Sequence, residues 1–124
     1  MSNPNQKKAL VVEDEEPVNK GLCELLAIKG WDAEGVHSVG EAIKRLDTDP
    51  DIILLDLMLP DGDGMRVLER VRRDQLRSKV IVTTGLIDPS RMNKVNQLNP
   101  DKFFHKPLDF IKLFKVLEDY KAAQ

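Results

Sequence analysis

The feature that most constrains the fold is an alternation, repeated five times, of short apolar segments with amphipathic helical segments. Short apolar segments bounded by polar residues are typical of strands that are buried on both faces. The predicted strands are residues 9–12, 33–36, 52–55, 80–82 and 103–105. The predicted helices are residues 17–28, 39–46, 65–71, 89–95 and 108–120. This order predicts an α/β, doubly wound fold with a parallel sheet covered by helices on both faces.

Length, charge and cysteine content exclude several classes of protein. The 124 residues correspond to one domain, residues 1–124, with a core at about 7–121. The net charge of -2 excludes a protein whose main activity is nonspecific binding to nucleic acid or anionic membranes. A single cysteine, Cys23, excludes an intramolecular disulfide and a cysteine-rich metal site. Neither a membrane span nor a secretory leader is recognisable, so we expect a cytoplasmic protein.

Polar side chains follow four of the five predicted strands directly. Glu13 and Asp14 follow the first strand, and Asp56 follows the third. Thr83 and Thr84 follow the fourth strand, and Lys106 follows the fifth. Because the carboxyl ends of parallel strands meet at one edge of a sheet, ligands of such folds bind there. The sequence therefore predicts one crevice with three carboxylates, a hydroxyl group and an ammonium group.

The residue types in this crevice favour phosphoryl chemistry on a carboxylate. Clustered carboxylates raise one another's pKa unless positive charge lies among them, and Lys106 supplies one such charge. A divalent cation would supply the rest, and a few hard oxygen ligands suit Mg²⁺ best. An aspartate with a metal, a hydroxyl group and a lysine is typical of attack by a carboxylate on a phosphoryl group.

Each of these features also has an ordinary structural explanation when it is taken alone. An acidic first turn favours the helix dipole, an aspartate after a strand commonly caps a helix, and a lysine before proline is usually at the surface. Their common position at the ends of consecutive strands is what favours a functional site.

Four segments carry a resemblance to a known family. They are residues 10–15 (LVVEDE), 53–64 (ILLDLMLPDGDG), 80–85 (VIVTTG) and 103–107 (FFHKP). With them the chain resembles the receiver domain of two-component response regulators, of the kind that chemotaxis regulators exemplify, over essentially its whole length. The resemblance implies a flavodoxin-like sheet with strand order 2-1-3-4-5 and five helices.

The resemblance also implies a phosphorylation site. Asp56 would accept a phosphoryl group from a histidine kinase or a phosphotransfer protein. Mg²⁺ would be held by Glu13, Asp14 and Asp56 together with the backbone carbonyl of Met58. Glutamate at position 13 departs mildly from the family, in which aspartate is common.

Further roles follow from the same resemblance. Thr84 would be the switch hydroxyl, Lys106 would contact the phosphoryl group, and Phe103 would be the aromatic that moves inward on activation. A cis peptide bond is expected before Pro107. The apolar residues two positions after the acceptor and the switch, Met58 and Leu86, predict slow self-dephosphorylation.

The partners implied are the phosphodonor and either a downstream protein or an output domain, without direct binding of nucleic acid or membrane by this domain. The domain would catalyse its own phosphorylation and dephosphorylation without being an enzyme that acts on other substrates. Two alternatives stay open: a phosphohydrolase with an aspartyl-phosphate intermediate, and a pseudo-receiver that acts without phosphorylation. The hydrolase would carry a second aspartate where Met58 stands. It also stays open whether the chain is a complete regulator or part of a longer protein.

Overall fold

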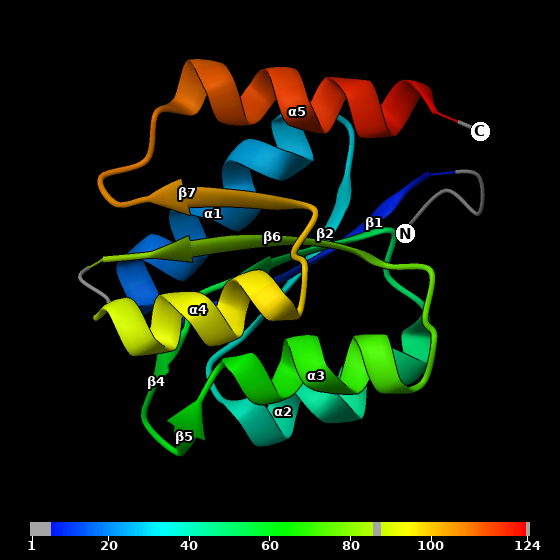
Figure 1. The fold of residues 1–124 in the computed structure, drawn as a ribbon. Helices are drawn as coiled ribbons and strands as arrows, with labels where there is room; N and C mark the ends of the chain where they lie inside the picture. Colours follow the sequence, from blue (N-terminus) through cyan, green and yellow to red (C-terminus); the bar gives the residue numbers. More distant parts are fainter. Residues whose placement is uncertain (1–5, 86–87, 124) are drawn as a thin grey trace.

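A five-stranded parallel sheet forms the centre of the structure, a computed structural model that describes residues 6–85 and 88–123 (Figure 1). Its strands are β1 (Lys8–Val12), β2 (Asp32–Val36), β3 (Ile52–Leu55), β6 (Lys79–Thr84) and β7 (Lys102–His105). Their order in the sheet is β2-β1-β3-β6-β7, and every neighbouring pair is parallel. Numbered by their place in the sequence, these five strands have the predicted order 2-1-3-4-5, so the predicted fold is confirmed.

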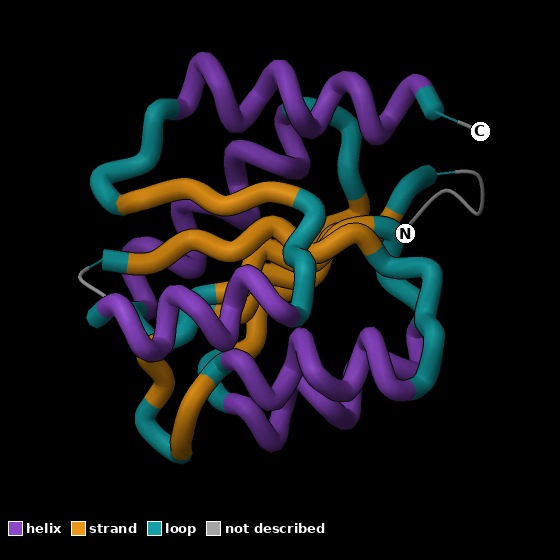
Figure 2. The backbone as a smooth tube through the Cα atoms, viewed as in Figure 1, coloured by secondary structure: helices purple, strands orange, loops and turns teal. Residues whose placement is uncertain are grey.

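Five α-helices cover the sheet among the residues described, and they lie in two layers, one on each face (Figure 2). The helices are α1 (Glu16–Ile28), α2 (Val39–Arg45), α3 (Met65–Arg73), α4 (Pro89–Gln97) and α5 (Phe110–Ala122). Two apolar clusters show which helices share a face, because one contains residues of α1 and α5 and the other contains residues of α2, α3 and α4. No helix among the residues described is long and apolar enough to span a membrane.

Alternation along the strands supplies both clusters with side chains. Leu10 and Val12 pack towards α2 and α3, whereas Ala9 and Val11 pack towards α1 and α5. All four residues of β3 are buried, as expected for a central strand of a parallel sheet. The apolar segments in the sequence are therefore continuous because both faces of the sheet need apolar side chains.

The helix starts differ in how well the sequence predicts them. Ser38 and Asp88 are N-caps of residue types that commonly begin helices, and their side chains accept hydrogen bonds from the backbone N–H groups of Glu41 and Arg91. The last helix begins at Phe110, two residues later than predicted, because Asp109 caps it by accepting from the Lys112 N–H.

Two short elements between the main ones were not predicted. A 3-10 turn at Leu46–Thr48 follows α2, and a small antiparallel hairpin of β4 (Met58–Leu59) and β5 (Gly62–Asp63) precedes α3. Within this hairpin Gly62 has a φ of 144°, which favours glycine. The hairpin is tied to α2, because the exposed Asp61 carboxylate accepts hydrogen bonds from the backbone N–H groups of Val39 and Gly40.

Candidate functional site

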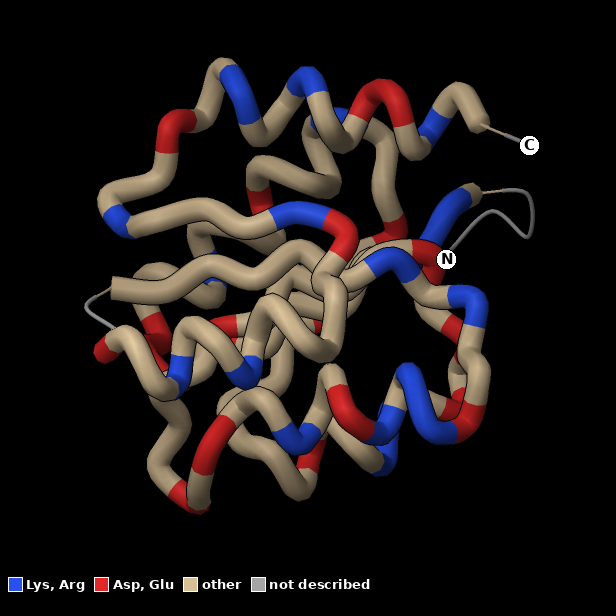
Figure 3. Tube along the Cα trace, in the orientation of Figure 1, with Lys and Arg blue, Asp and Glu red and all other residues tan. Residues whose placement is uncertain are grey.

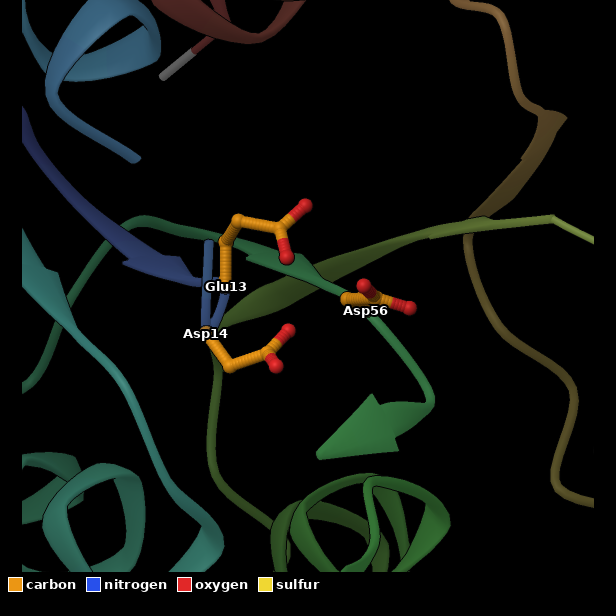
Figure 4. A group of neighbouring side chains, drawn as sticks. All are labelled: Glu13, Asp14 and Asp56. Atoms are coloured by element: carbon orange, nitrogen blue, oxygen red, sulfur yellow. The ribbon is translucent and has the colours of Figure 1, made fainter. Parts of the chain in front are cut away.

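The carboxyl ends of β1 and β3 bring three carboxylates together (Figure 4). Glu13, Asp14 and Asp56 each offer one oxygen, and these oxygens all lie within 4.8 Å of one another. Glu13 and Asp56 are only 2% and 4% exposed, whereas Asp14 is exposed to solvent. Glu13 and Asp56 thus form the buried part of the cluster, and Asp14 forms the part that is open to solvent.

Lys106 is the positive group of the site and comes from the end of β7. Its Nζ lies 2.6 Å from Glu13 Oε1 and 3.0 Å from Asp56 Oδ2. The backbone N–H of Lys106 donates to the Thr84 carbonyl, and the peptide bond to Pro107 is cis. One ammonium group therefore bridges two nearly buried carboxylates that are far apart in the sequence.

The surroundings of Glu13 and Lys106 raise the pKa values of both groups, for different reasons. Burial is the largest cause for Glu13 and, with the neighbouring Asp56 charge, it outweighs Lys106 and raises the pKa of Glu13 to about 7. Burial lowers the pKa of Lys106, but its hydrogen bonds to Glu13 and Asp56 outweigh this effect and the net shift is upward. Lys106 accordingly stays charged. Its single positive charge is shared by Glu13 and Asp56 and does not balance two carboxylates.

A hard divalent cation fits this donor set. The three converging groups are all carboxylates, and one of them is open to solvent, which leaves room for water ligands. Mg²⁺ is characteristically held by one or two protein carboxylates and completes its octahedron with water or phosphate oxygens. The excess negative charge and the oxygen-only donors therefore suit Mg²⁺ better than a thiolate- or imidazole-binding metal.

The Asp56 carboxylate is oriented by two donors. Asp56 Oδ2 accepts from Lys106 Nζ, and Asp56 Oδ1 accepts from the backbone N–H of Met58 at 3.1 Å. The backbone of Met58 thus lies beside the cluster.

Thr84 lies on β6, the strand next to β3, and Phe103 lies on β7, the strand beyond it. Thr84 is 1% exposed, and its Oγ1 hydrogen-bonds to no atom of the part of the chain that the structure describes. A buried hydroxyl group with a spare donor is suited to an incoming anionic oxygen. Phe103 is partly buried and packs against the apolar cluster that contains residues of α2, α3 and α4. The centroids of its ring and of the His105 ring lie 4.9 Å apart in an edge-on arrangement. Leu86, the other residue expected to flank the path of water, lies outside the described residues.

Asn19 is a buried residue that the sequence did not single out. Its Nδ2 donates to the carbonyls of Glu13 at 2.9 Å and Val36 at 2.8 Å, which joins the acidic loop to the end of β2. Gly35 makes room for it, because a Cβ at position 35 would lie 1.9 Å from Asn19 Oδ1. An asparagine inside a helix is ordinarily a surface residue, so only its burial shows that it positions the loop.

A parallel sheet of this order, with a carboxylate cluster and a lysine at its carboxyl edge, defines the class of phosphoacceptor signalling domains. The family model of the response regulator receiver domain matches residues 9–118. The chain therefore belongs to the response regulator receiver domain family.

Relatives and solved structures agree with this assignment. The chain is 34% identical over 109 residues to the transcriptional regulatory protein TrcR of Mycobacterium tuberculosis, covering 86% of this chain and 42% of the relative. It is 37% identical over 110 residues to the transcriptional activator protein IrlR of Burkholderia pseudomallei, covering 86% and 46%. It thus spans less than half the length of these curated relatives.

Two solved structures illustrate the shared fold. A CheY-like receiver domain protein from Methanospirillum hungatei superposes with a TM-score of 0.85 at 22% identity, covering 92% of each chain. The response regulator protein TrrA from Thermotoga maritima, solved in complex with Mg²⁺ and BeF, superposes with a TM-score of 0.79 at 23% identity, covering 93% of this chain and 99% of that one. These two likenesses show the fold, and the family model is what makes the chain a signalling module of the receiver type.

Proposed function

We propose that Asp56 is the residue that accepts a phosphoryl group from a phosphohistidine on a histidine kinase or a phosphotransfer protein. The observation that carries this proposal is the orientation of the nearly buried Asp56 carboxylate by Lys106 Nζ and the Met58 N–H inside a carboxylate cluster. A carboxylate oxygen attacks phosphorus, the bond between phosphorus and the donor nitrogen breaks, and the imidazole that leaves takes up a proton from solvent.

The surrounding residues have separate roles in this transfer. Glu13, Asp14 and Asp56, with the Met58 carbonyl, would hold Mg²⁺, which when bound neutralises charge on the phosphoryl oxygens. Lys106 contacts one of these oxygens, and Thr84 donates its free hydroxyl proton to another. Movement of Thr84 towards the phosphoryl group opens space beside β7, which Phe103 then fills. Magnesium with BeF in TrrA, a protein of the same fold, is consistent with these roles.

An apolar groove beside the site fits the phosphodonor protein. The groove has a volume of about 360 Å³ and lies between the first turns of α1 and the start of α5. Val18 and Phe110, both more than a third exposed, line it, and Lys106 lines its end at the carboxylate cluster. A helix of the donor seated in this groove would bring a phosphohistidine up to Asp56. Its continuity with the site is what favours the donor as the occupant.

Position 58 argues against the hydrolase alternative. A hydrolase that works through an aspartyl phosphate needs a general acid near the acceptor, and the thioether of Met58 neither gives nor takes a proton. Turnover of a phosphomonoester by the purified protein would restore that alternative.

Labelling with acetyl phosphate and Mg²⁺ tests the acceptor. The wild type should gain the mass of one phosphoryl group, and Asp56→Asn should gain none. Asp47→Asn is the matched control, because it removes an exposed aspartate carboxylate outside the cluster. Equal labelling of Asp56→Asn and the wild type would contradict the proposal.

A further inference from the structure

Arg91 connects α4 to the β4–β5 hairpin next to the proposed acceptor. Its Nη2 lies 2.9 Å from Asp63 Oδ1, and its Nη1 lies 3.5 Å from the sulfur of Met58. The side chains of Arg91 and Asp63 are 27% and 35% exposed, so the ion pair is partly shielded from solvent. Figure 3 shows basic positions along α4, which Figure 1 places beside this hairpin.

The carboxylate end of this ion pair is anchored to the backbone, and the guanidinium end comes from the capped first turn of α4. Asp63 Oδ1 also accepts from the Met65 N–H at 2.9 Å, at the start of α3. The N–H of Arg91 donates to the Asp88 carboxylate that caps α4. A carboxylate held in this way loses less freedom on pairing than an unrestrained surface side chain does. The guanidinium group thereby contacts the Met58 sulfur from the start of α4, while Asp63, in the hairpin before α3, pairs with it.

Met58 is the residue through which this arrangement reaches the acceptor. Its backbone N–H donates to Asp56 Oδ1, and it pairs with Asp63 across the hairpin. Its side chain is 54% exposed although it is long and apolar. It lines a cavity of about 560 Å³ that Asp14 and Arg91 also line. An unrestrained methionine would sample many rotamers here, since its three side-chain torsions are flexible.

We propose that the Arg91–Asp63 ion pair holds the Met58 side chain across the approach to phosphorylated Asp56 and so slows loss of the phosphoryl group. This inference rests on the proposed function. In hydrolysis the water oxygen bonds to phosphorus, the bond from phosphorus to the Asp56 oxygen breaks, and both water protons stay with inorganic phosphate. The water must lie in line with the breaking bond, and a fixed apolar side chain excludes it. Arg91 is a positioning residue, because it acts through Met58.

The test measures the decay of the phosphorylated protein after acetyl phosphate has been removed. Arg91→Ala should accelerate decay about three- to five-fold, the scale of a partly exposed ion pair. Asp63→Asn should accelerate it similarly, since asparagine keeps the hydrogen bond to the Met65 N–H but lacks the charge. Arg91→Lys should decay slowly, because lysine retains the ion pair. In a Met58→Ala background, Arg91→Ala should have no further effect.

Controls separate this inference from the proposed function. Lys94→Ala removes a positive charge one turn further along α4 from an exposed position, and it should leave the decay rate unchanged. Absence of phosphorylation in the wild type would overturn the proposed function. Normal phosphorylation with unchanged decay in both Arg91→Ala and Asp63→Asn would overturn only the role of the ion pair. Acceleration by Arg91→Ala that persists in the Met58→Ala background would show that Arg91 does not act through Met58.

Discussion

A single methyl group added at Gly64 should disturb the proposed phosphoacceptor, Asp56, without touching its side chain. Gly64 has a φ of -58°, which any residue can adopt, so backbone conformation does not demand glycine there. A Cβ at this position would lie 2.3 Å from the carbonyl oxygen of Asp56 and 2.8 Å from Leu57 Cα. Both neighbours are backbone atoms at the end of β3 and have no rotamer by which to move away.

The magnitude follows from the size of this overlap. Cβ atoms essentially never lie closer than 3.0 Å to such atoms, so the Asp56 loop or the start of α3 has to shift by about 0.7 Å. Forcing an extra methyl group into a well-packed site costs about 1–3 kcal/mol. For a chain of this length, that loss lowers the melting temperature by about 4–12 °C. A displacement of this size in a reacting group should slow phosphorylation about ten- to hundred-fold.

Gly21→Ala is the matched control. Gly21 lies inside α1, and a Cβ there would meet nothing within 4 Å. The same added methyl group should stabilise the protein by up to about 1 kcal/mol through helix propensity. Thermal unfolding followed by circular dichroism, and the rate of labelling by acetyl phosphate, measure the two effects. A Gly64→Ala protein as stable and as rapidly phosphorylated as the wild type would refute the reasoning.

Three further predictions concern the charges and the loop of the site. In magnesium-free buffer, protonated Glu13 contributes stability that is fully present below pH 4.5 and is lost as the pH rises to about 7, because between these values the folded protein holds a proton that the unfolded chain releases. The loss in the free energy of unfolding is at most about 3 kcal/mol. Denaturant titrations at several pH values should show this slope, and a slope of equal size in Glu13→Gln would contradict the prediction. Asn19→Ala leaves the buried Glu13 carbonyl without its side-chain donor, so this substitution should lower the free energy of unfolding by about 1–3 kcal/mol. It should also weaken Mg²⁺ binding measured by calorimetry. Asn93→Ala, at an exposed position, should have neither effect. Removal of metal with a chelator should abolish labelling of Asp56 by acetyl phosphate, and persistent labelling would exclude a metal requirement.

The sequence determined the fold class and most of the site because both depend on local patterns. Five apolar segments, each followed by a helix, require a parallel sheet, and parallel strands place their following residues at one edge. Glu13, Asp56 and Lys106 could therefore be assigned to one crevice before any distance was known. The N-caps at Ser38 and Asp88 were equally predictable, since capping is read from neighbouring residues.

Only the tertiary structure shows the contacts between groups that are far apart in the sequence. No local pattern shows that Asn19 bridges two strand ends, that Arg91 rests on Met58, or that Gly64 lies against the backbone of Asp56. The late start of α5 and the β4–β5 hairpin were missed because turn geometry competes with apolar periodicity over one or two residues. The raised pKa of Glu13 likewise depends on burial and on the distance to Lys106. The sequence specifies which residues reach the edge of the sheet, and packing in three dimensions specifies their distances and their charges.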